Sequence, residues 1–328
     1  MASALRVEIT RGATIETEHA VICAVADGDG RITASFGDVD RVYPLRSAMK
    51  PLQALPLVAS GAAGAMGVSD VELAIACGSH NGEPGHVELV TDWLARLGLS
   101  EEHLQCGRAR PMADAWDVLD SDDALEATRS KHNCSGKHTG FLTLALHLGV
   151  DPARYLDPTA PAQQAVLQRL AEAFDLPRSS LQTAVDGCGA PVACVSARTL
   201  ASGLTTLLQN TDESTSVLGA ISAHPWAIAG TGRFDTRVTT ALAGNGFTKV
   251  GAEGGHVAVL RDPGVTIAMK ALTGDRRAAD AVMFRMLCRY GALDPSDLPD
   301  LADAEILNSA GTAVGRVLVR GLDDMSVV

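Results

Sequence analysis

The chain lacks long apolar runs, a basic leader and any surplus of positive charge. No stretch of about 18 uninterrupted apolar residues occurs. The N-terminus MASALRVEITR has no basic start followed by an apolar block, so neither a membrane span nor a secretory signal is expected. The net charge is −12 at pH 7, only 4% of the 328 residues are aromatic, and no basic stripe is interleaved with them. Nucleic acids and anionic membranes are therefore disfavoured as partners, and we expect a cytoplasmic protein with a small-molecule ligand.

Ordered cysteine spacing is also missing. The seven cysteines are scattered along the chain, and none forms a Cys-x-x-Cys pair. Without an export signal a disulfide framework is not expected in a chain of this length. Each cysteine is therefore expected to be a buried apolar residue or a metal ligand.

Lysine is scarce among the basic residues. Only five of the 27 are lysine, namely Lys50, Lys131, Lys137, Lys249 and Lys270. Arginine stays protonated, whereas a desolvated lysine can lose its proton and act as a base or a ligand. The five lysines are therefore candidates for a base or a metal ligand. The alternative is that they survive by genetic drift without such a role.

Hydrophobic periodicity divides the chain into three parts. Residues 5–37 alternate as a β-hairpin, and residues 46–215 show mainly helical spacing. Strand patterns return after about residue 220, with a hairpin turning at 261–264, a helix over 276–290 and a last strand over 312–318. The first and last parts are expected to share one sheet.

This order of elements predicts an α/β fold in which helices flank an antiparallel sheet and a mainly helical region is inserted. The sheet-containing domain is expected to comprise 1–45 plus 216–328, and the helical domain 46–215. The active site is expected at their interface.

Three short motifs follow one another in an informative order. They are Ser47-x-x-Lys50 at a helix start, Ser79-x-Asn81 in a helical region, and Lys249-x-Gly251 on a strand. This is the motif order of serine β-lactamases and penicillin-binding proteins. The alternative is three unrelated surface motifs.

The chemistry that such motifs serve is acyl transfer. A serine hydroxyl needs a base within hydrogen-bond reach, and a lysine can be that base when burial and a neighbouring cation favour its neutral form. We expect Ser47 to be the nucleophile and Lys50 its base, with Lys249 as the neighbouring cation. Ser79, between the two amines, would pass a proton to the leaving group.

Two cysteines lie among polar residues and glycines rather than in apolar runs. They are Cys134 in NCSGKHTGF and Cys188 in VDGCGAP. Two thiolates and a nitrogen donor suit a soft tetrahedral metal site such as zinc. Spacing alone favours a polar substrate loop without metal.

Six segments together carry a family resemblance: PLRSAMKPLQ, ACGSHNGEPGH, KHNCSGKHTGFL, VDGCGAP, HPWAIAGTGRFDT and KVGAEGGHVAVL. In wording and order they resemble the thermolabile, Rhizobium-type L-asparaginases, and the resemblance covers nearly the whole chain. It implies hydrolysis of L-asparagine to L-aspartate and ammonia, on a fold similar to that of serine β-lactamases and glutaminases.

The resemblance also implies roles for individual residues. Its two Ser–Lys tandems fall on Ser47 with Lys50 and on Ser79 with Lys249, although Lys270 on the next strand is an alternative partner of Ser79. Its zinc site falls on Cys134, Lys137 and Cys188. A lysine ligand must be neutral, so the metal itself would drive the loss of its proton.

Charged and polar side chains of the same segments are candidates for binding the substrate. Arg46 can pair with the carboxylate of a free amino acid and Asp186 with its ammonium group; the further candidates are His80, Asn81, Asn133 and His138. Alternative functions are a glutaminase or another serine amidase or peptidase with the same chemistry, and a zinc-stabilised binding protein without catalysis. A homodimer is expected from the low charge and the high alanine and glycine content.

Overall fold

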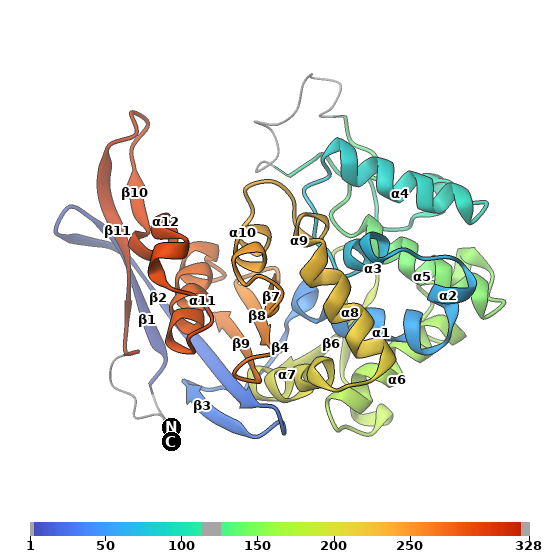
Figure 1. The fold of residues 1–328 in the computed structure, drawn as a ribbon, viewed down its shortest axis with the longest axis horizontal. Helices are drawn as coiled ribbons and strands as arrows, with labels where there is room; N and C mark the ends of the chain where they lie inside the picture. Colours follow the sequence, from blue (N-terminus) through green and yellow to red (C-terminus); the bar gives the residue numbers. More distant parts are fainter. Residues whose placement is uncertain (1–2, 113–125, 323–328) are drawn as a thin grey trace. The chain divides into compact units, whose positions relative to one another are not determined.

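The computed structural model describes residues 3–112 and 126–322, which fall into two compact units (Figure 1). Unit 1 consists of Met1–Ala48, Val195–Thr205 and Ala241–Val328, and unit 2 of Met49–Cys194 and Thr206–Thr240. The division drawn from the sequence assigns 216–240 to the sheet-containing domain, whereas the contacts of these residues belong to unit 2.

Unit 1 is built on an antiparallel sheet of eight strands. The strands are β1 (Leu5–Arg11), β2 (Thr14–Asp27), β3 (Ile32–Phe36), β7 (Gly246–Val250), β8 (Gly255–Leu260), β9 (Val265–Ala271), β10 (Glu305–Leu307) and β11 (Ala313–Arg320). Their order is β10-β11-β1-β2-β9-β8-β7, with β3 paired to β2. The N-terminal strands thus join the C-terminal ones through β2–β9 and β1–β11, and the expected shared sheet is confirmed.

Helices pack on this sheet and complete unit 1. They are α7 (Ala197–Leu204), α11 (Arg276–Arg289) and α12 (Pro299–Asp303). Helix α11 contacts β8, β9 and β11, and α7 contacts β2 and β9. The Thr266 hydroxyl donates to the Ala201 carbonyl at 2.6 Å, so α7 lies on the face of β9 that also carries Lys270. The expected α/β architecture, an antiparallel sheet flanked by helices, is confirmed.

Unit 2 is mainly helical. Its helices are α1 (Lys50–Ala59), α2 (Ala62–Ala65), α3 (Asp70–Ala76), α4 (Pro84–Arg96), α5 (Ser135–His147), α6 (Pro161–Ala173), α8 (Asp212–Ala223), α9 (Pro225–Ile228) and α10 (Phe234–Ala241). Helix α5 contacts α1, α2, α3, α4 and α6, and every residue from Ser135 to Ala145 is buried. Polar side chains on α5 are therefore held in the interior, which suits a site rather than a solvent face.

Short elements near the predicted site residues include β4 (Val42–Pro44), the 3₁₀ helix η1 (Arg46–Met49), and the hairpin of β5 (Thr183–Val185) and β6 (Pro191–Ser196). The two glycines, the aspartate and the proline of LQTAVDGCGAP interrupt the helical spacing and predict a loop. In the structure its ends pair as β5 and β6, and the Asp186 N–H donates to Ala190 O at 2.9 Å. The glycines and the proline, which favour a turn, concealed these strands. No helix within 3–112 and 126–322 combines the length and apolar character needed to span a bilayer.

Candidate active site

Lys50 and Ser79 form the central contact of unit 2. Lys50 is the first residue of α1 and its side chain is fully buried. Its Nζ lies 3.0 Å from Ser79 Oγ and also donates to the carbonyl of Gly78. An amine in direct contact with a hydroxyl can exchange a proton with it, which is the requirement for activating or relaying through a serine.

The loop that carries Ser79 is fixed by its backbone. The Ser79 N–H donates to Ile228 O and the Asn81 N–H to Ala229 O, both at 2.8 Å. Gly82 has φ +75°, and a Cβ there would lie 2.6 Å from the Lys131 carbonyl oxygen. Only glycine fits this left-handed and crowded position, so the backbone of the loop is held in one closely packed conformation.

His80 is buried and held as a neutral ring. Its Nδ1 accepts from the Gly82 N–H at 3.1 Å, so Nε2 donates to Ser135 Oγ at 2.9 Å. Burial, followed by the nearby His86 and Lys50, holds the pKa of His80 well below its usual range. The ring stacks on His86 at 4.8 Å between centroids, and His86 stacks on Trp226 at 3.9 Å.

Asn81 is also fully buried, and its amide is bonded at both ends. Its Nδ2 donates to Glu83 Oε1 at 2.8 Å and its Oδ1 accepts from Arg233 at 2.7 Å. His80 and Asn81 were predicted to bind substrate. The structure engages their polar atoms with protein groups, and their direct contact with substrate stays a prediction.

His138 lies on α5 and has one ring nitrogen without a protein partner in the described part of the chain. Tyr155 Oη lies 2.6 Å from His138 Nδ1 and accepts from the Gln105 N–H at 2.7 Å. Burial holds the pKa of His138 well below its usual range. The buried Nε2 has no hydrogen-bond partner among the described residues. Asn133 is half-buried in the turn directly before α5.

The predicted zinc ligands gather at the start of α5 and in the β5–β6 turn. Lys137 Nζ lies 3.1 Å from Cys188 Sγ, and both side chains are buried, as is Cys134. A hydrogen bond with Cys188 holds the pKa of Cys134 well below its usual range, against the effect of burial and with help from Lys50 and Lys137. Two sulfurs and one nitrogen in a buried cluster fit a soft tetrahedral metal.

Within the described ranges no three His, Cys, Asp or Glu side chains form a group able to hold a metal. The predicted zinc site therefore depends on Lys137 as its third donor. Asp186 stands next to the cluster: its Oδ2 is 3.9 Å from Lys137 Nζ and 3.8 Å from Cys188 Sγ. Its Oδ1 accepts from the Gly187 N–H at 2.7 Å. The carboxylate can therefore orient the lysine, beside its predicted role in binding an ammonium group.

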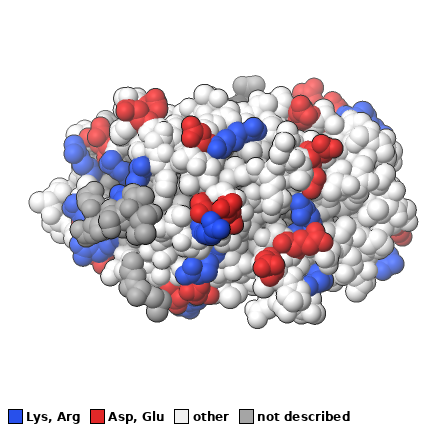
Figure 2. Space-filling view, turned by 60° about the horizontal axis from the view of Figure 1, so that its bottom comes forward, with Lys and Arg blue, Asp and Glu red and all other residues white. Residues whose placement is uncertain are grey.

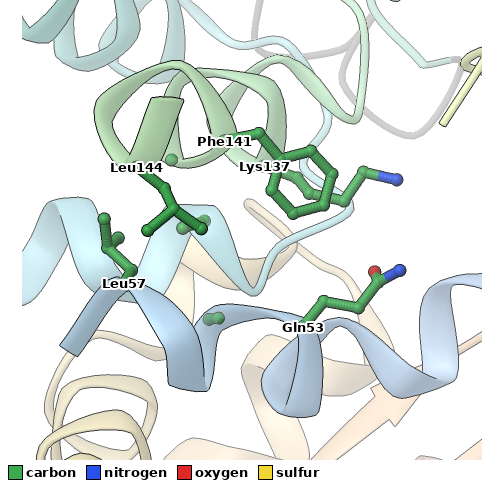
Figure 3. A pocket seen from close by; sticks show the side chains of 8 residues that line it. Gln53, Leu57, Lys137, Phe141 and Leu144 are labelled. Carbon is green, nitrogen blue, oxygen red and sulfur yellow. The ribbon is translucent and has the colours of Figure 1, made fainter. Parts of the chain in front are cut away.

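A small cavity lies beside Lys137, between α1 and α5 (Figure 3). It has a volume of about 10 Å³ and is lined mainly by apolar side chains, with the Gln53 amide and Lys137 reaching past it. This is room for about one water molecule. It is too small for an amino acid, so it is not the substrate pocket.

Unit 1 holds the other predicted residues. Ser47 is buried in η1, directly after Arg46, whose φ of +46° is unusual for a residue with a side chain. A Cβ on Gly251 would lie 2.7 Å from the Leu45 carbonyl oxygen, and one on Gly255 3.5 Å from it. The Leu45 carbonyl, two residues before Ser47, therefore lies against the β7–β8 turn.

Lys249 and Lys270 lie on the same face of the sheet. Lys249 is paired with Val257 and Lys270 with Gly255, and positions 255 and 257 of β8 point to the same side. Lys249 Nζ donates to Val250 O at 2.7 Å, and Lys270 Nζ donates to Glu253 O. Burial lowers the pKa of Lys270. The pairing of Ser79 with Lys249 or Lys270 stays a prediction.

Glu83, Trp226 and Arg233 were not among the predicted site residues. Each lies within a segment that carried the resemblance, ACGSHNGEPGH or HPWAIAGTGRFDT. The feature that marks these three residues is the burial of Glu83, two residues after Asn81. Burial cannot be read from the sequence, so no sequence signal identified them. Figure 2 shows one face of the molecule, on which many Lys and Arg side chains lie beside Asp and Glu side chains.

Known proteins resemble this chain in sequence and in structure. The sequence model of a family described as L-asparaginase II matches residues 7–319. No curated protein matches the chain. Similar solved structures include a β-lactamase from Mycobacterium bovis, with 17% identity, 82% of this chain and 94% of that chain covered, and a TM-score of 0.43. Another is described as a candidate β-lactamase from Bacteroides dorei, with 11% identity, 82% and 85% covered, and a TM-score of 0.37.

Proposed function

Because the chain belongs to the L-asparaginase II family, and is therefore an amidohydrolase acting on L-asparagine, we propose that it works through an acyl-enzyme formed on Ser47. The observation that carries this mechanism is the buried contact of Lys50 with Ser79 at 3.0 Å. Lys50 also follows Ser47 by three residues at the start of a helix. Lys50 is thus associated with two serines: it lies three positions after Ser47 in the sequence, and it contacts the Ser79 hydroxyl in the structure.

In the proposed acylation step, neutral Lys50 takes the proton of Ser47 while Ser47 Oγ attacks the side-chain amide carbon of asparagine. The C–N bond then breaks, and the proton passes from Lys50 through the Ser79 hydroxyl to the departing nitrogen, which leaves as ammonia. Water then attacks the resulting ester and loses a proton to Lys50. The C–O bond to Ser47 breaks, aspartate leaves, and Lys50 returns the proton to Ser47 Oγ, which restores the starting state. A permanently protonated arginine could not take part in this cycle.

The charged ends of the substrate need partners of opposite sign. We propose that Arg46, next to the nucleophile, pairs with the α-carboxylate and that Asp186 pairs with the ammonium group. Arg46 is half-buried and Asp186 is largely buried, which limits competition by water.

Cys134, Lys137 and Cys188 would hold zinc in an organising role. Bound there, the metal would supply a fixed positive centre that orders the β5–β6 turn and with it Asp186. The two Ser–Lys pairs would be redundant in a metal-hydroxide mechanism, which favours the organising role.

The test is ammonia release from asparagine and glutamine, measured side by side in the wild type and in Lys50→Arg. The proposal expects turnover of asparagine and none in the variant. The two substrates differ by one methylene, worth about 1–3 kcal/mol in a pocket, so the ratio of their kcat/KM values decides between asparaginase and glutaminase. A folded wild type that binds zinc and releases no ammonia from either substrate would instead identify a binding protein. The homodimer and the cytoplasmic location also remain proposals.

A further inference from the structure

Glu83 is a buried carboxylate with an unusually complete set of donors. Its Oε1 accepts from Asn81 Nδ2 at 2.8 Å and from the Thr231 N–H at 2.7 Å. Its Oε2 accepts from Trp226 Nε1 at 3.0 Å and from Thr231 Oγ1 at 2.8 Å. Burial raises the pKa of Glu83, but these bonds outweigh it, so the pKa lies below its usual value and the group is ionised.

The segment around Trp226–Arg233 is shaped to receive this carboxylate. Gly230 has φ +117°, and a Cβ there would lie 2.5 Å from Glu83 Oε1. Arg233 donates to Asn81 Oδ1 at 2.7 Å, which fixes the orientation of the Asn81 amide toward Glu83. Gly230 and Arg233 thus allow residues 226–233 to pack closely around the Glu83 side chain.

A helix cap does not explain Glu83. It stands at the N-cap position of α4, where a carboxylate commonly accepts from the helix's own N–H groups. Its side chain makes no such cap bond. Its bonds go to Asn81, two residues before it, and to residues more than 140 positions later in the chain.

The same segment holds the backbone of the Ser79 loop. Ser79 and Asn81 donate to Ile228 O and Ala229 O, so the loop and the segment are joined by backbone bonds at one end and by Glu83 at the other. A buried carboxylate is costly unless it is fully bonded. This one is placed where it fastens the loop that brings Ser79 to Lys50.

We propose that Glu83 is a positioning residue that keeps Ser79 Oγ within hydrogen-bond reach of Lys50 Nζ by fastening residues 79–83 to residues 226–233. The proposal rests on the proposed function, since Glu83 acts on the reaction only through Ser79.

Amide hydrogen exchange tests the fastening without reference to activity. Glu83→Gln keeps the shape, but its NH₂ group meets an N–H donor at either oxygen position: Trp226 at one, and Asn81 and Thr231 at the other. Exchange in peptides covering 78–83 should rise about tenfold or more. The control is Glu72→Gln, which alters a buried glutamate at the start of α3 that is bonded to Ser69 and Arg96. Equal exchange in this segment for Glu83→Gln and the wild type would overturn the proposal.

Kinetics then test the link to the reaction. A displacement of about 1 Å costs about 10²-fold in rate, so Glu83→Gln should lower kcat by that order while KM for asparagine stays within about twofold. Glu72→Gln should keep kcat at a comparable loss of melting temperature. Faster loop exchange with unchanged kcat would overturn the positioning role. A wild type without ammonia release would defeat the proposed function alone, because the exchange experiment still decides whether Glu83 fastens the loop.

Discussion

Lys50 shows why the choice of side chain matters at a single position. Its amine is fully buried and lies against Ser79 Oγ and the Gly78 carbonyl. An ammonium group can donate to both oxygens, and a neutral amine can accept from the hydroxyl. A guanidinium group could make the first kind of contact only, which agrees with the use of lysine here in a chain rich in arginine.

Ser47→Ala and Ser79→Ala distinguish the two serines. Ser47→Ala should abolish acyl-enzyme formation and remove most of the roughly 10⁶-fold or larger acceleration of an enzyme. Ser79→Ala should lose a smaller factor, about 10²–10⁴, because only proton transfer is impaired. Ammonia release and trapping of the acyl-enzyme by mass spectrometry measure both. Near-normal turnover in folded Ser47→Ala would move the nucleophile to Ser79.

His86 links the site to acid sensitivity. Burial is the main reason that its pKa falls to about 4, while in the unfolded chain it is about 6.5. As the pH falls, the unfolded state therefore binds the proton before the folded state does. The contribution of neutral His86 to the free energy of unfolding is complete above about pH 6.5 and is lost as the pH falls toward 4. The loss is on the order of 3 kcal/mol.

His86→Phe should therefore flatten the dependence of unfolding free energy on pH between about 6.5 and 4. The variant keeps an aromatic ring beside Trp226 and loses the hydrogen bond between His86 Nε2 and Trp226 O. The loss of this bond lowers the free energy of unfolding by about 1 kcal/mol at every pH. Denaturant titrations at several pH values give the slope. Parallel curves for variant and wild type would show that His86 does not carry the effect.

At the scale of elements, close backbone approaches place the chemistry. The β7–β8 turn meets the segment before η1 at Gly251, where the neighbour is the Leu45 carbonyl, a backbone atom that cannot move cheaply. Ser47 follows two residues later. The position of Ser47, the proposed nucleophile, thus depends on the close approach of Leu45 to Gly251, which a side chain at position 251 would prevent.

Gly251→Ala should destabilise unit 1 by about 1–3 kcal/mol and lower kcat, because the added methyl group displaces the Leu45–Ala48 segment. Gly219→Ala is the matched control, since a Cβ there in the middle of α8 meets nothing within 4 Å and should be neutral or stabilising. Thermal melts and asparagine kinetics compare the two. Similar stability and kcat in both variants would show that the β7–β8 turn does not control the position of Ser47, the proposed nucleophile.

Elements with local signals could be predicted from the sequence. β8 and β9 form the expected hairpin, and α11 spans Arg276–Arg289, close to the expected 276–290. Their residues interact with neighbours a few positions away. The strand β5 was missed because it has three residues, all exposed, and therefore no burial pattern.

At the scale of the whole molecule, the site could be predicted only in part. The motif Ser47-x-x-Lys50 is local, so its spacing was visible. The bonds between Glu83 and Thr231 join residues 148 positions apart, and the shared face of Lys249 and Lys270 depends on the register of two strand pairs. Neither is encoded in a short motif, since both arise from packing.

Removal of metal tests the organisation of the whole enzyme. Zinc-depleted protein should keep measurable turnover with a raised KM, and added zinc should mainly restore affinity, since Cys134, Lys137 and Cys188 are proposed to order the turn that holds Asp186. Elemental analysis and kinetics before and after chelation measure this. Complete loss of kcat in protein that is still folded by circular dichroism would give the metal a direct part in bond breaking.

The stack of His80, His86 and Trp226 also makes the protein suited to optical measurement. The indole lies 3.9 Å from the His86 ring, and that ring lies 4.8 Å from His80, the residue next to Ser79. Indole emission responds to the charge and distance of a stacked imidazole, so events at the Ser79 loop should reach a natural fluorophore without any label. With the other two tryptophans, Trp93 and Trp116, replaced by phenylalanine, substrate arrival could be followed by stopped-flow fluorescence on the timescale of a single turnover.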